Sequence, residues 1–416
     1  MTVSIDKPSA DGDHALLRDF SLQALPDAFY DDPYPTYRAL QTLDPVHRMP
    51  DGSLFLTRHS DLEAIYKDTT RFTSDKKIEF APKYGTGSLL FEHHTTSLVF
   101  NDPPLHTRVR NLIAGALNPR AIAETEPRLI TLVDGLLDAM EARGSVDLIE
   151  DFASAIPIEV IGNLLGVPHD ERGPLRGWSL AILGALEPKL SPEAQERGER
   201  AVAEFLDYLR RLVADRRVRP GDAERDVLTR LIVGETADGE KLSETELLQN
   251  CIFILNAGHE TTTNLIGNGL ELLLRFPDQK QRLIDDPNLI RTAIEEFLRF
   301  ESSNQLGNRG VAIDSEIGGV ALPKGSLVTL CIGAANRDPA QFPAADELDI
   351  ARTPNRHLAF ASGAHVCAGL NLARMEGRIA IGRFIARFPN FKAAGRPQRA
   401  RRARFRGFTA LPVTLG

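Results

Sequence analysis

Cys367 lies in the stretch HLAFASGAHVCAG, residues 357–369, and is one of three cysteines in the chain. The run after it, AGLNLARMEGRIAIGRFIARF, has a helical period, so we expect the sulfur at a helix amino terminus, where free N–H groups and the dipole favour a thiolate. Gly363 and Gly369 leave room for a flat ligand, and His365 adds a donor at the same rim. A soft anionic sulfur offered to a flat ligand indicates iron in a haem. A buried structural thiol is the alternative interpretation.

A second candidate is the stretch LNAGHETTTNLIG, residues 255–267, inside an apolar helical run that begins near Leu247. Gly258 within a helix costs about 1 kcal/mol relative to alanine. Glu260 introduces a carboxylate into an otherwise apolar helix. Both features need a compensating role. A solvent-facing polar stripe with a tolerated glycine is the alternative interpretation.

Two charged patterns complete the candidates. Glu296 and Arg299, in AIEEFLRF, are three residues apart and can form a charge-assisted pair on one helix face. In FNDPPLHTRVRNLI, Asp102 and the prolines after it favour a helix start, after which His106 and Arg110 share one face. Alone, these patterns are equally typical of an exposed ion pair, worth about 0 to 1 kcal/mol, and of a basic surface.

The elements that must position these residues are mostly helices. Apolar residues recur at helical spacing in AETEPRLITLVDGLLDAMEARG and ERAVAEFLDYLRRLVADRR. Strand patterns occur in GSLFLTR near residue 55 and in GGVALPKGSLVTLCIGAA after residue 317, with a turn at Pro323 and Gly325. The sequence therefore predicts a helix-rich protein with few strands. Its length of 416 residues allows one large domain or several, and no repeat or linker marks a boundary.

The composition excludes several classes of protein. The net charge of −8 gives no general attraction to nucleic acid or to an anionic membrane, and no run approaches the roughly 20 apolar residues of a spanning helix. No signal-peptide pattern is present, so we expect a cytoplasmic protein. Three cysteines far apart favour neither disulfides nor a paired-cysteine zinc site. We interpret RPQRARRARFRG, residues 396–407, as a solvated edge strand protected by its six arginines, with a docking patch for an acidic protein as the alternative.

Taken together, the four motifs resemble the cytochrome P-450 family in order and spacing, and smaller matches run nearly end to end. The chain departs at Ala361, where the family usually has glycine. The resemblance implies a mainly α fold with small β-sheets: a flexible segment over residues 1–19, then one helix-rich domain over residues 20–416, with haem b (iron protoporphyrin IX) between a distal helix and the cysteine loop. The residues that fit the haem-binding signature, in which the cysteine thiolate is the axial iron ligand, are Phe360, Gly363, His365, Cys367 and Gly369.

The resemblance also assigns the distal stretch. Thr261 would hydrogen-bond the bound oxygen, and Glu260 would help to deliver protons. Ala257 and Gly258 would lie against the haem. Glycine would let the helix open locally, so that a hydroxyl bonds a freed carbonyl and leaves a groove for oxygen and water.

For the charged pairs, the resemblance implies structural and cofactor-binding roles. Glu296 and Arg299 would form a structural network with a third basic residue, for which Arg352 and His357 are the candidates. Arg108 would point away from His106 and contribute to a basic patch for an electron-transfer partner. The side chains that would pair with the two haem carboxylates are His106, Arg110, Arg309 and His365.

The implied activity is that of a haem-thiolate monooxygenase, which inserts one oxygen atom from O2 into a small apolar organic substrate by hydroxylation or dealkylation. About fifty residues follow Cys367, too few for a reductase module, so electrons would come from a separate ferredoxin and ferredoxin reductase. We expect a monomer. The residues expected to line the substrate pocket are Leu89, Leu90, Phe91, Leu98, Val99, Phe253, Leu306 and Phe408.

Three alternatives remain. A haem-binding sensor or carrier would need the cysteine loop but not Glu260 and Thr261. A cysteine-nucleophile hydrolase would need a histidine base oriented by a third group, whereas His365 has another explanation. A peroxide-driven relative is a variant of the same class, and the acid and threonine pair disfavours it.

Overall fold

The computed structural model describes residues 17, 19–223, 226–234 and 241–416. Most of the flexible segment predicted for residues 1–19 lies outside the described residues. Leu17 and Phe20 are buried, and the ring of Phe20 meets that of Phe55 edge-on, with 5.0 Å between the centroids. The beginning of the described chain is therefore tied to the fold by apolar packing.

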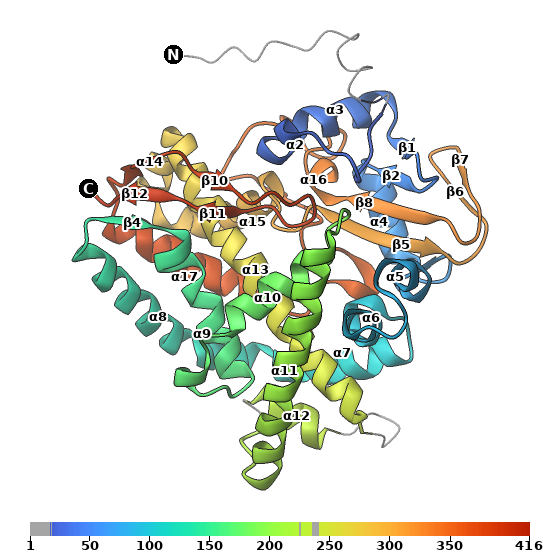
Figure 1. Ribbon diagram of the computed structural model, residues 1–416. Helices are drawn as coiled ribbons and strands as arrows, with labels where there is room; N and C mark the ends of the chain where they lie inside the picture. The colour runs from blue at the N-terminus through green and yellow to red at the C-terminus, as the bar shows by residue number, and fades with distance from the viewer. Residues whose placement is uncertain (1–16, 18, 224–225, 235–240) are drawn as a thin grey trace.

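Most of the described chain is helical, and the sheets are small (Figure 1). The helices are α2 (Asp27–Asp31), α3 (Tyr34–Leu43), α4 (His59–Lys67), α5 (Lys77–Tyr84), α6 (Leu89–Thr96), α7 (Leu105–Ala116), α8 (Pro119–Glu141), α9 (Ala155–Leu164), α10 (Leu175–Gly184), α11 (Pro192–Val218), α12 (Val227–Val233), α13 (Glu244–Arg275), α14 (Pro277–Asp285), α15 (Ile290–Phe300), α16 (Ile332–Ala335) and α17 (Leu370–Arg387). Single turns are η1 (Leu98–Phe100), η2 (Ile149–Ala153), η3 (His169–Glu171), η4 (Pro287–Leu289) and η5 (Gly363–His365).

The strands form one five-stranded sheet and three smaller ones. The large sheet has the order β1-β2-β8-β5-β3, and only the β2–β8 pairing is parallel. Its strands are β1 (Val46–Arg48), β2 (Leu54–Leu56), β3 (Phe72–Thr73), β5 (Leu306–Val311) and β8 (Leu327–Cys331). The others are β4 (Ser145–Asp147), β6 (Ser315–Ile317), β7 (Val320–Leu322), β9 (Lys392–Ala393), β10 (Gln398–Arg399), β11 (Phe408–Ala410) and β12 (Pro412–Thr414). The strands predicted near residues 55 and 317 are confirmed as β2, β7 and β8.

The large sheet buries both faces. Along β2, Phe55 packs into one apolar cluster, whereas Leu54 and Leu56 pack into another. This alternation follows from the two-residue period of a strand. The sheet therefore separates two small cores, one towards α3 and one towards α4.

Helix α13 is the central element and runs diagonally through the molecule (Figure 1). Its start is fixed by a capping box, in which the Ser243 hydroxyl accepts from the N–H of Glu246 and the Glu246 carboxylate accepts from the N–H of Ser243. The residues up to Leu255 belong to one large core, and those from Leu265 onwards belong to the other. The short stretch between the two cores contains the Gly258, Glu260 and Thr261 motif.

The arginine-rich segment 396–407 contains β10, which pairs with β11 in a two-stranded sheet, and the loop that leads to β11. The predicted edge strand is therefore present, but most of the arginines of the segment turn inward, which corrects the prediction that they are solvated and its alternative, a docking patch. Arg404 donates to the carbonyls of Leu186 and Leu306. Arg402 and Arg406 bind buried carboxylates. These positive charges lie inside the protein because they pair with acidic side chains that are distant in the sequence.

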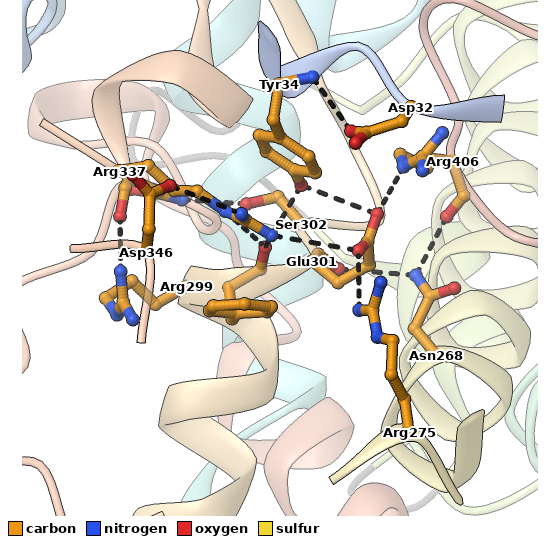
Figure 2. Close-up of polar contacts among 12 residues, drawn as sticks. Asp32, Tyr34, Asn268, Arg275, Arg299, Glu301, Ser302, Arg337, Asp346 and Arg406 are labelled. Atoms are coloured by element: carbon orange, nitrogen blue, oxygen red, sulfur yellow. Dashed lines mark hydrogen bonds and ion pairs between the residues drawn. The ribbon is translucent and has the colours of Figure 1, made fainter. Parts of the chain in front are cut away.

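Glu301 is the centre of the larger of these networks (Figure 2). Its carboxylate, 1% exposed, accepts from Arg406 and lies 3.5 Å from the guanidinium of Arg275. The hydroxyl of Tyr34 donates to the same carboxylate over 3.4 Å. Burial raises the pKa of Glu301, but the surrounding arginines lower it more, so the carboxyl group is held ionised well below its usual range.

Candidate functional site

One face of α13 is accessible where the helix passes between the two cores. Phe253, Ala257 and Thr261 are spaced by four residues, so they lie on one face, and all three are at least partly exposed in a helix whose neighbouring residues are buried. The Thr261 hydroxyl donates to the carbonyl of Ala257 over 2.7 Å. A small residue, a hydroxyl and an aromatic ring thus line this face.

Gly258 is required by the packing of α9 against α13. A Cβ at this position would lie 2.4 Å from Cδ1 of Ile161 in α9. The helix continues without a break through the position. The glycine therefore permits close approach of α9 to α13, and the local opening of the helix expected from the sequence is not seen in the structure.

Glu260 is directed away from the accessible face and is buried. Nη1 of Arg402 lies 2.5 and 2.6 Å from its two carboxylate oxygens, and Nη2 donates to the carbonyl of Leu180. Burial raises the pKa of Glu260 to about 7, although Arg402 acts to lower it. A carboxyl that titrates near neutrality therefore stands next to the Thr261 hydroxyl in the chain.

The cysteine loop is a tight turn before α17. The N–H of Cys367 donates to the carbonyl of Phe360 over 2.9 Å, and α17 begins three residues later with Gly369 as its N-cap. Gly363 has φ +66°, and a Cβ there would lie 2.3 Å from the Tyr66 carbonyl oxygen. Ala361, which stands where the family usually has glycine, has φ +56°, so this alanine adopts a conformation that favours glycine.

The Cys367 sulfur is desolvated as well as placed at a helix amino terminus. Burial raises the pKa of the Cys367 thiol, and the backbone N–H of Gly369, Arg110 and Arg374 lower it by less. The helix terminus is present, but the desolvation of the sulfur outweighs it. A cation bound to the sulfur is what would keep it ionised.

A cluster of cations lies beside the cysteine loop. The rings of His106 and His365 are 4.1 Å apart, and Nε2 of His106 is buried without a hydrogen-bond partner among the described residues. Burial lowers the pKa of His365 to about 3, helped by Arg309, His106 and Arg110. Two arginines and two histidines, gathered around an unpartnered nitrogen, offer charged and neutral donors to an anionic group.

Lys76 is a member of this cluster that sequence reasoning missed. Its side chain is 1% exposed, and Nζ lies 3.1 Å from a carboxylate oxygen of Glu79. Burial lowers the pKa of Lys76, and Arg309 lowers it further. Its position in TSDKK resembles an ordinary surface turn, so the sequence contained no signal for its burial.

Glu296 and Arg299 form a fully buried pair at the end of α15. Two guanidinium nitrogens of Arg299 donate to the two carboxylate oxygens of Glu296, each over 2.8 Å. Of the two candidates for the third member, Arg352 makes the contact, with Nε 3.2 Å from Glu296. His357 instead contacts Glu295, which also binds Arg374. The network is buried and holds the segment that leads to the cysteine loop.

The structure separates the expected pocket residues into two groups. Leu89, Phe91, Val99 and Phe253 retain some exposure, and Leu98 and Phe408 retain 4% and 6%. Leu90 and Leu306 expose no surface, so their prediction as pocket residues is corrected. Leu90 packs against Gly198 of α11, and Leu306 packs into the core beside α3.

Arg108 was expected in a basic surface patch, and the structure corrects this as well. Its guanidinium binds the carboxylate of Glu246, in the first turn of α13. Both side chains are about one-fifth exposed, at 23% and 18%. The charge of Arg108 is therefore compensated within the protein.

These residues fit a haem. Cys367 offers a partly buried sulfur as iron ligand, and Ala257 presents only a methyl group on the accessible face of α13. The anion site for the haem carboxylates is formed by His106, Arg110, Arg309 and His365. The arrangement is chemically complete for a haem-thiolate centre.

Comparison with known proteins agrees with a haem-thiolate centre. The family described as Cytochrome P450 matches residues 186–408. A vitamin D(3) 25-hydroxylase of Pseudonocardia autotrophica is 38% identical over 395 residues, which cover 93% of this chain and 95% of the relative. The 6-deoxyerythronolide B hydroxylase of Saccharopolyspora erythraea is 36% identical, covering 87% and 90%. The crystal structure of P450BioI in complex with hexadec-9Z-enoic acid ligated acyl carrier protein superposes with a TM-score of 0.88 at 34% identity, covering 93% and 100%.

The chain belongs to the cytochrome P450 family. It has the cytochrome P450 fold, and it is a haem-binding monooxygenase. Among the described residues, no helix combines the length and apolar character needed to cross a membrane.

Proposed function

We propose that this monooxygenase inserts one oxygen atom from O2 into a small apolar organic substrate, by hydroxylation or dealkylation, with electrons from a ferredoxin and its reductase. The observation that carries the proposal is the adjacent pair on α13. Thr261 presents a hydroxyl on the accessible face, and Glu260 holds a titratable carboxyl behind it. A haem sensor or carrier has no use for such a pair.

The cofactor would be held by residues of three segments. Cys367 would bind the iron, and the haem carboxylates would pair with His106, Arg110, Arg309 and His365. When bound, the haem supplies the iron at which dioxygen is reduced and its O–O bond is split. Gly363 keeps the loop against the Tyr66 backbone, so that the sulfur has a fixed position.

The protein would supply the protons through the pair on α13. Glu260, with a pKa of about 7, can take up and release a proton near neutral pH, as general acid catalysis requires. The Thr261 oxygen has acceptor capacity beyond the bond in which its hydroxyl donates to the Ala257 carbonyl, so it would accept a hydrogen bond on the accessible face. Arg402 fixes the carboxylate of Glu260 in one orientation.

The substrate would lie against apolar side chains. Phe91 and Val99 come from the segment around α6, and Phe253 comes from the same face of α13 as Thr261. Two of the similar proteins are named as hydroxylases, of vitamin D(3) and of 6-deoxyerythronolide B. Both support hydroxylation of an apolar organic molecule as the reaction.

The test is the coupling of electron use to product in the Thr261→Ala variant. With surrogate ferredoxin and reductase and a panel of apolar substrates, we expect NADH consumption to continue and the product formed per NADH to fall several-fold, because the hydroxyl that passes the proton is absent. Thr263→Ala is the matched control, since the Thr263 hydroxyl makes the same bond to a carbonyl one turn back, at His259, but is buried.

Two results would contradict the proposal. Coupling in Thr261→Ala that equals the wild-type value would remove the role of the hydroxyl. Absence of product with every substrate, despite normal haem content, would favour a sensor or carrier. The absorption spectrum of the reduced protein with carbon monoxide should accompany both assays, because it reports whether the thiolate remains on the iron.

A further inference from the structure

The segment between α15 and β5 pairs with the loop that leads to β11. Asn304 and Phe405 form an isolated antiparallel bridge between the two segments. The residues on both sides of this pair are joined by backbone hydrogen bonds of 2.7 and 2.8 Å. Residues that face each other between such bonds have side chains that are close together and on the same face. The side chains of Asn304 and Phe405 are therefore neighbours.

The loop that contains Phe405 runs along the part of α13 that carries the candidate catalytic residues. At the beginning of the loop, Arg402 binds Glu260. At its end, Gly407 packs against Asn264, because a Cβ at Gly407 would lie 1.9 Å from Oδ1 of that asparagine. Glu260 and Asn264 are about one helical turn apart. Since Phe405 lies between the two contacts, the bridge stands beside this turn of α13.

Asn268 fixes both paired segments to the next turn of α13 (Figure 2). Its Nδ2 donates to the carbonyl of Glu301 over 3.3 Å and to the carbonyl of Arg406 over 3.0 Å. Its Oδ1 accepts from the guanidinium of Arg399 over 3.2 Å. Both ends of this buried amide are engaged, so Asn268 has a structural role.

Asn304 differs from Asn268 because its side chain is not satisfied by the protein. Between Glu301 and Leu306 it is the only residue that keeps accessible surface. Its Oδ1 is nevertheless buried, and it has no hydrogen-bond partner among the described residues. Such an oxygen is unfavourable, because it has lost contact with water without gaining another donor.

The face of the bridge that carries Asn304 is directed towards the expected substrate pocket. Phe405, on the same face, is 7% exposed and belongs to the apolar cluster against which Phe91 and Phe253 pack. A second unsatisfied amide lies on the adjacent turn of α13, where Asn264 is 6% exposed and its Nδ2 has no partner in the described part of the chain. An apolar pocket with a few polar groups at its edge is typical of a site for a small organic molecule.

We propose that Asn304 is a specificity-determining residue, which hydrogen-bonds a hydroxyl group of an otherwise apolar substrate. A hydroxyl matches an amide in either orientation, since it can donate to Oδ1 or accept from Nδ2. A pure hydrocarbon would leave Oδ1 without a partner, and an ionised carboxylate has no proton to donate to it. The inference rests on the proposed function, because it names the substrate class of the same pocket.

The test compares two ligands with one carbon skeleton, tetralin and 2-tetralol, which are titrated into the oxidised holoenzyme and followed by the change in haem absorption. In the Asn304→Leu variant, 2-tetralol should bind about 3- to 10-fold more weakly, as expected for the loss of one neutral hydrogen bond. Tetralin should bind at least as tightly as it does to the wild type, because leucine adds apolar surface.

Gln305→Met is the matched control, since it removes the amide of the adjacent residue. Nε2 of Gln305 donates to the carbonyl of Ser302 over 2.7 Å. Its Oε1 is directed towards Gly333 of α16, where a Cβ would lie 1.9 Å from it. This amide therefore faces away from the pocket, and the ratio of the two affinities should equal the wild-type ratio.

Two results would overturn the proposal. Equal weakening of both ligands in Asn304→Leu would mean that the side chain only supports its segment. Failure of 2-tetralol to bind to the wild type would remove the hydroxyl site. The titration uses no electrons, so its outcome is separate from the coupling assay with Thr261→Ala. Selective loss of 2-tetralol in a protein that forms no product would keep Asn304 as a ligand-binding residue and remove only the proposed function.

Discussion

Ala361 shows how much one residue of the cysteine loop depends on its surroundings. An L-residue in the left-handed region costs roughly 1 to 2 kcal/mol, and Ala361 has φ +56°. Its N–H donates to the carbonyl of Leu358, and the next bond of the turn joins Cys367 to Phe360. These two bonds hold the turn in the shape that glycine would adopt without cost.

We predict that Ala361→Gly raises the free energy of unfolding of the holoenzyme by about 0.5 to 1 kcal/mol. The relief of the left-handed strain exceeds the entropy that glycine adds to the unfolded chain. The measurement is the midpoint of urea unfolding. Ala364→Gly is the control in the same loop, because Ala364 lies in the turn η5 without a positive φ, and there glycine should destabilise. Equal losses in both variants would disprove the strain at Ala361.

At the scale of single residues, the sequence indicated which side chains are candidates for the chemistry, but it did not indicate the side chains that they contact in the folded protein. Cys367 and Glu260 were singled out because a cysteine among glycines and a carboxylate in an apolar helix are unusual in themselves, whereas Thr261 was assigned through the family resemblance. The partner of Glu260 is Arg402, which is 142 residues away. A local sequence pattern cannot relate two residues that are so far apart in the chain, so the pair is identified only in the folded structure.

At the scale of elements, the geometry of α15 explains why only one of the two candidate bases reaches Glu296. Glu295 and Glu296 are consecutive, so their side chains point about 100° apart on the helix. Glu296 faces Arg299 and Arg352, whereas Glu295 faces His357. Both candidates, Arg352 and His357, could be located from the sequence near the cysteine loop, but the direction of their side chains could not be predicted from it.

A double-mutant cycle tests this assignment. We predict a coupling energy of about 1 kcal/mol or more between Glu296→Gln and Arg352→Gln, because Arg352 is hydrogen-bonded to the carboxylate. The cycle of Glu296→Gln with His357→Gln should give a coupling energy within about 0.5 kcal/mol of zero. The free energy of unfolding in urea provides both values. The reverse ranking would return His357 to the network.

The elements themselves were largely predictable, with one exception. The apolar periodicity of α13 and the strand patterns of β2, β7 and β8 are local, so the sequence contained them. The segment 396–407 was misread because a run of arginines is normally solvated. Its arginines are drawn inward by Glu260 and Glu301, and a pattern within twelve residues contains no information about acids elsewhere.

At the scale of the whole molecule, Glu301 joins parts of the chain that are far apart in sequence. Tyr34 comes from α3, Arg275 from the end of α13, and Arg406 from the C-terminal hairpin (Figure 2). The carboxylate shares its one negative charge among several guanidinium groups. Removing its charge would leave the buried guanidinium of Arg406 without its ion-pair partner.

We predict that Glu301→Gln lowers the free energy of unfolding by about 3 to 5 kcal/mol at pH 7. Since the folded pKa of Glu301 lies below its unfolded value, the wild-type advantage is present above the unfolded pKa and is lost as pH falls. The difference should therefore shrink by up to about 1.4 kcal/mol per pH unit below about pH 4.3. Urea unfolding at several pH values measures it.

The control is Glu316→Gln, an exposed glutamate of β6, which should change stability by less than about 0.5 kcal/mol. A Glu301→Gln variant as stable as this control would mean that solvent, and not the Glu301 carboxylate, screens the charges of the arginines. The network would then be incidental to the stability of the fold.

The inward-facing arginines of the hairpin also affect the order in which the protein can mature. Arg402 follows Glu260 by 142 residues, and Arg406 follows Glu301 by 105 residues. Chains generally begin to fold from the amino terminus during translation. During translation, each of these two ion pairs therefore forms only after more than a hundred further residues have been added behind the acid.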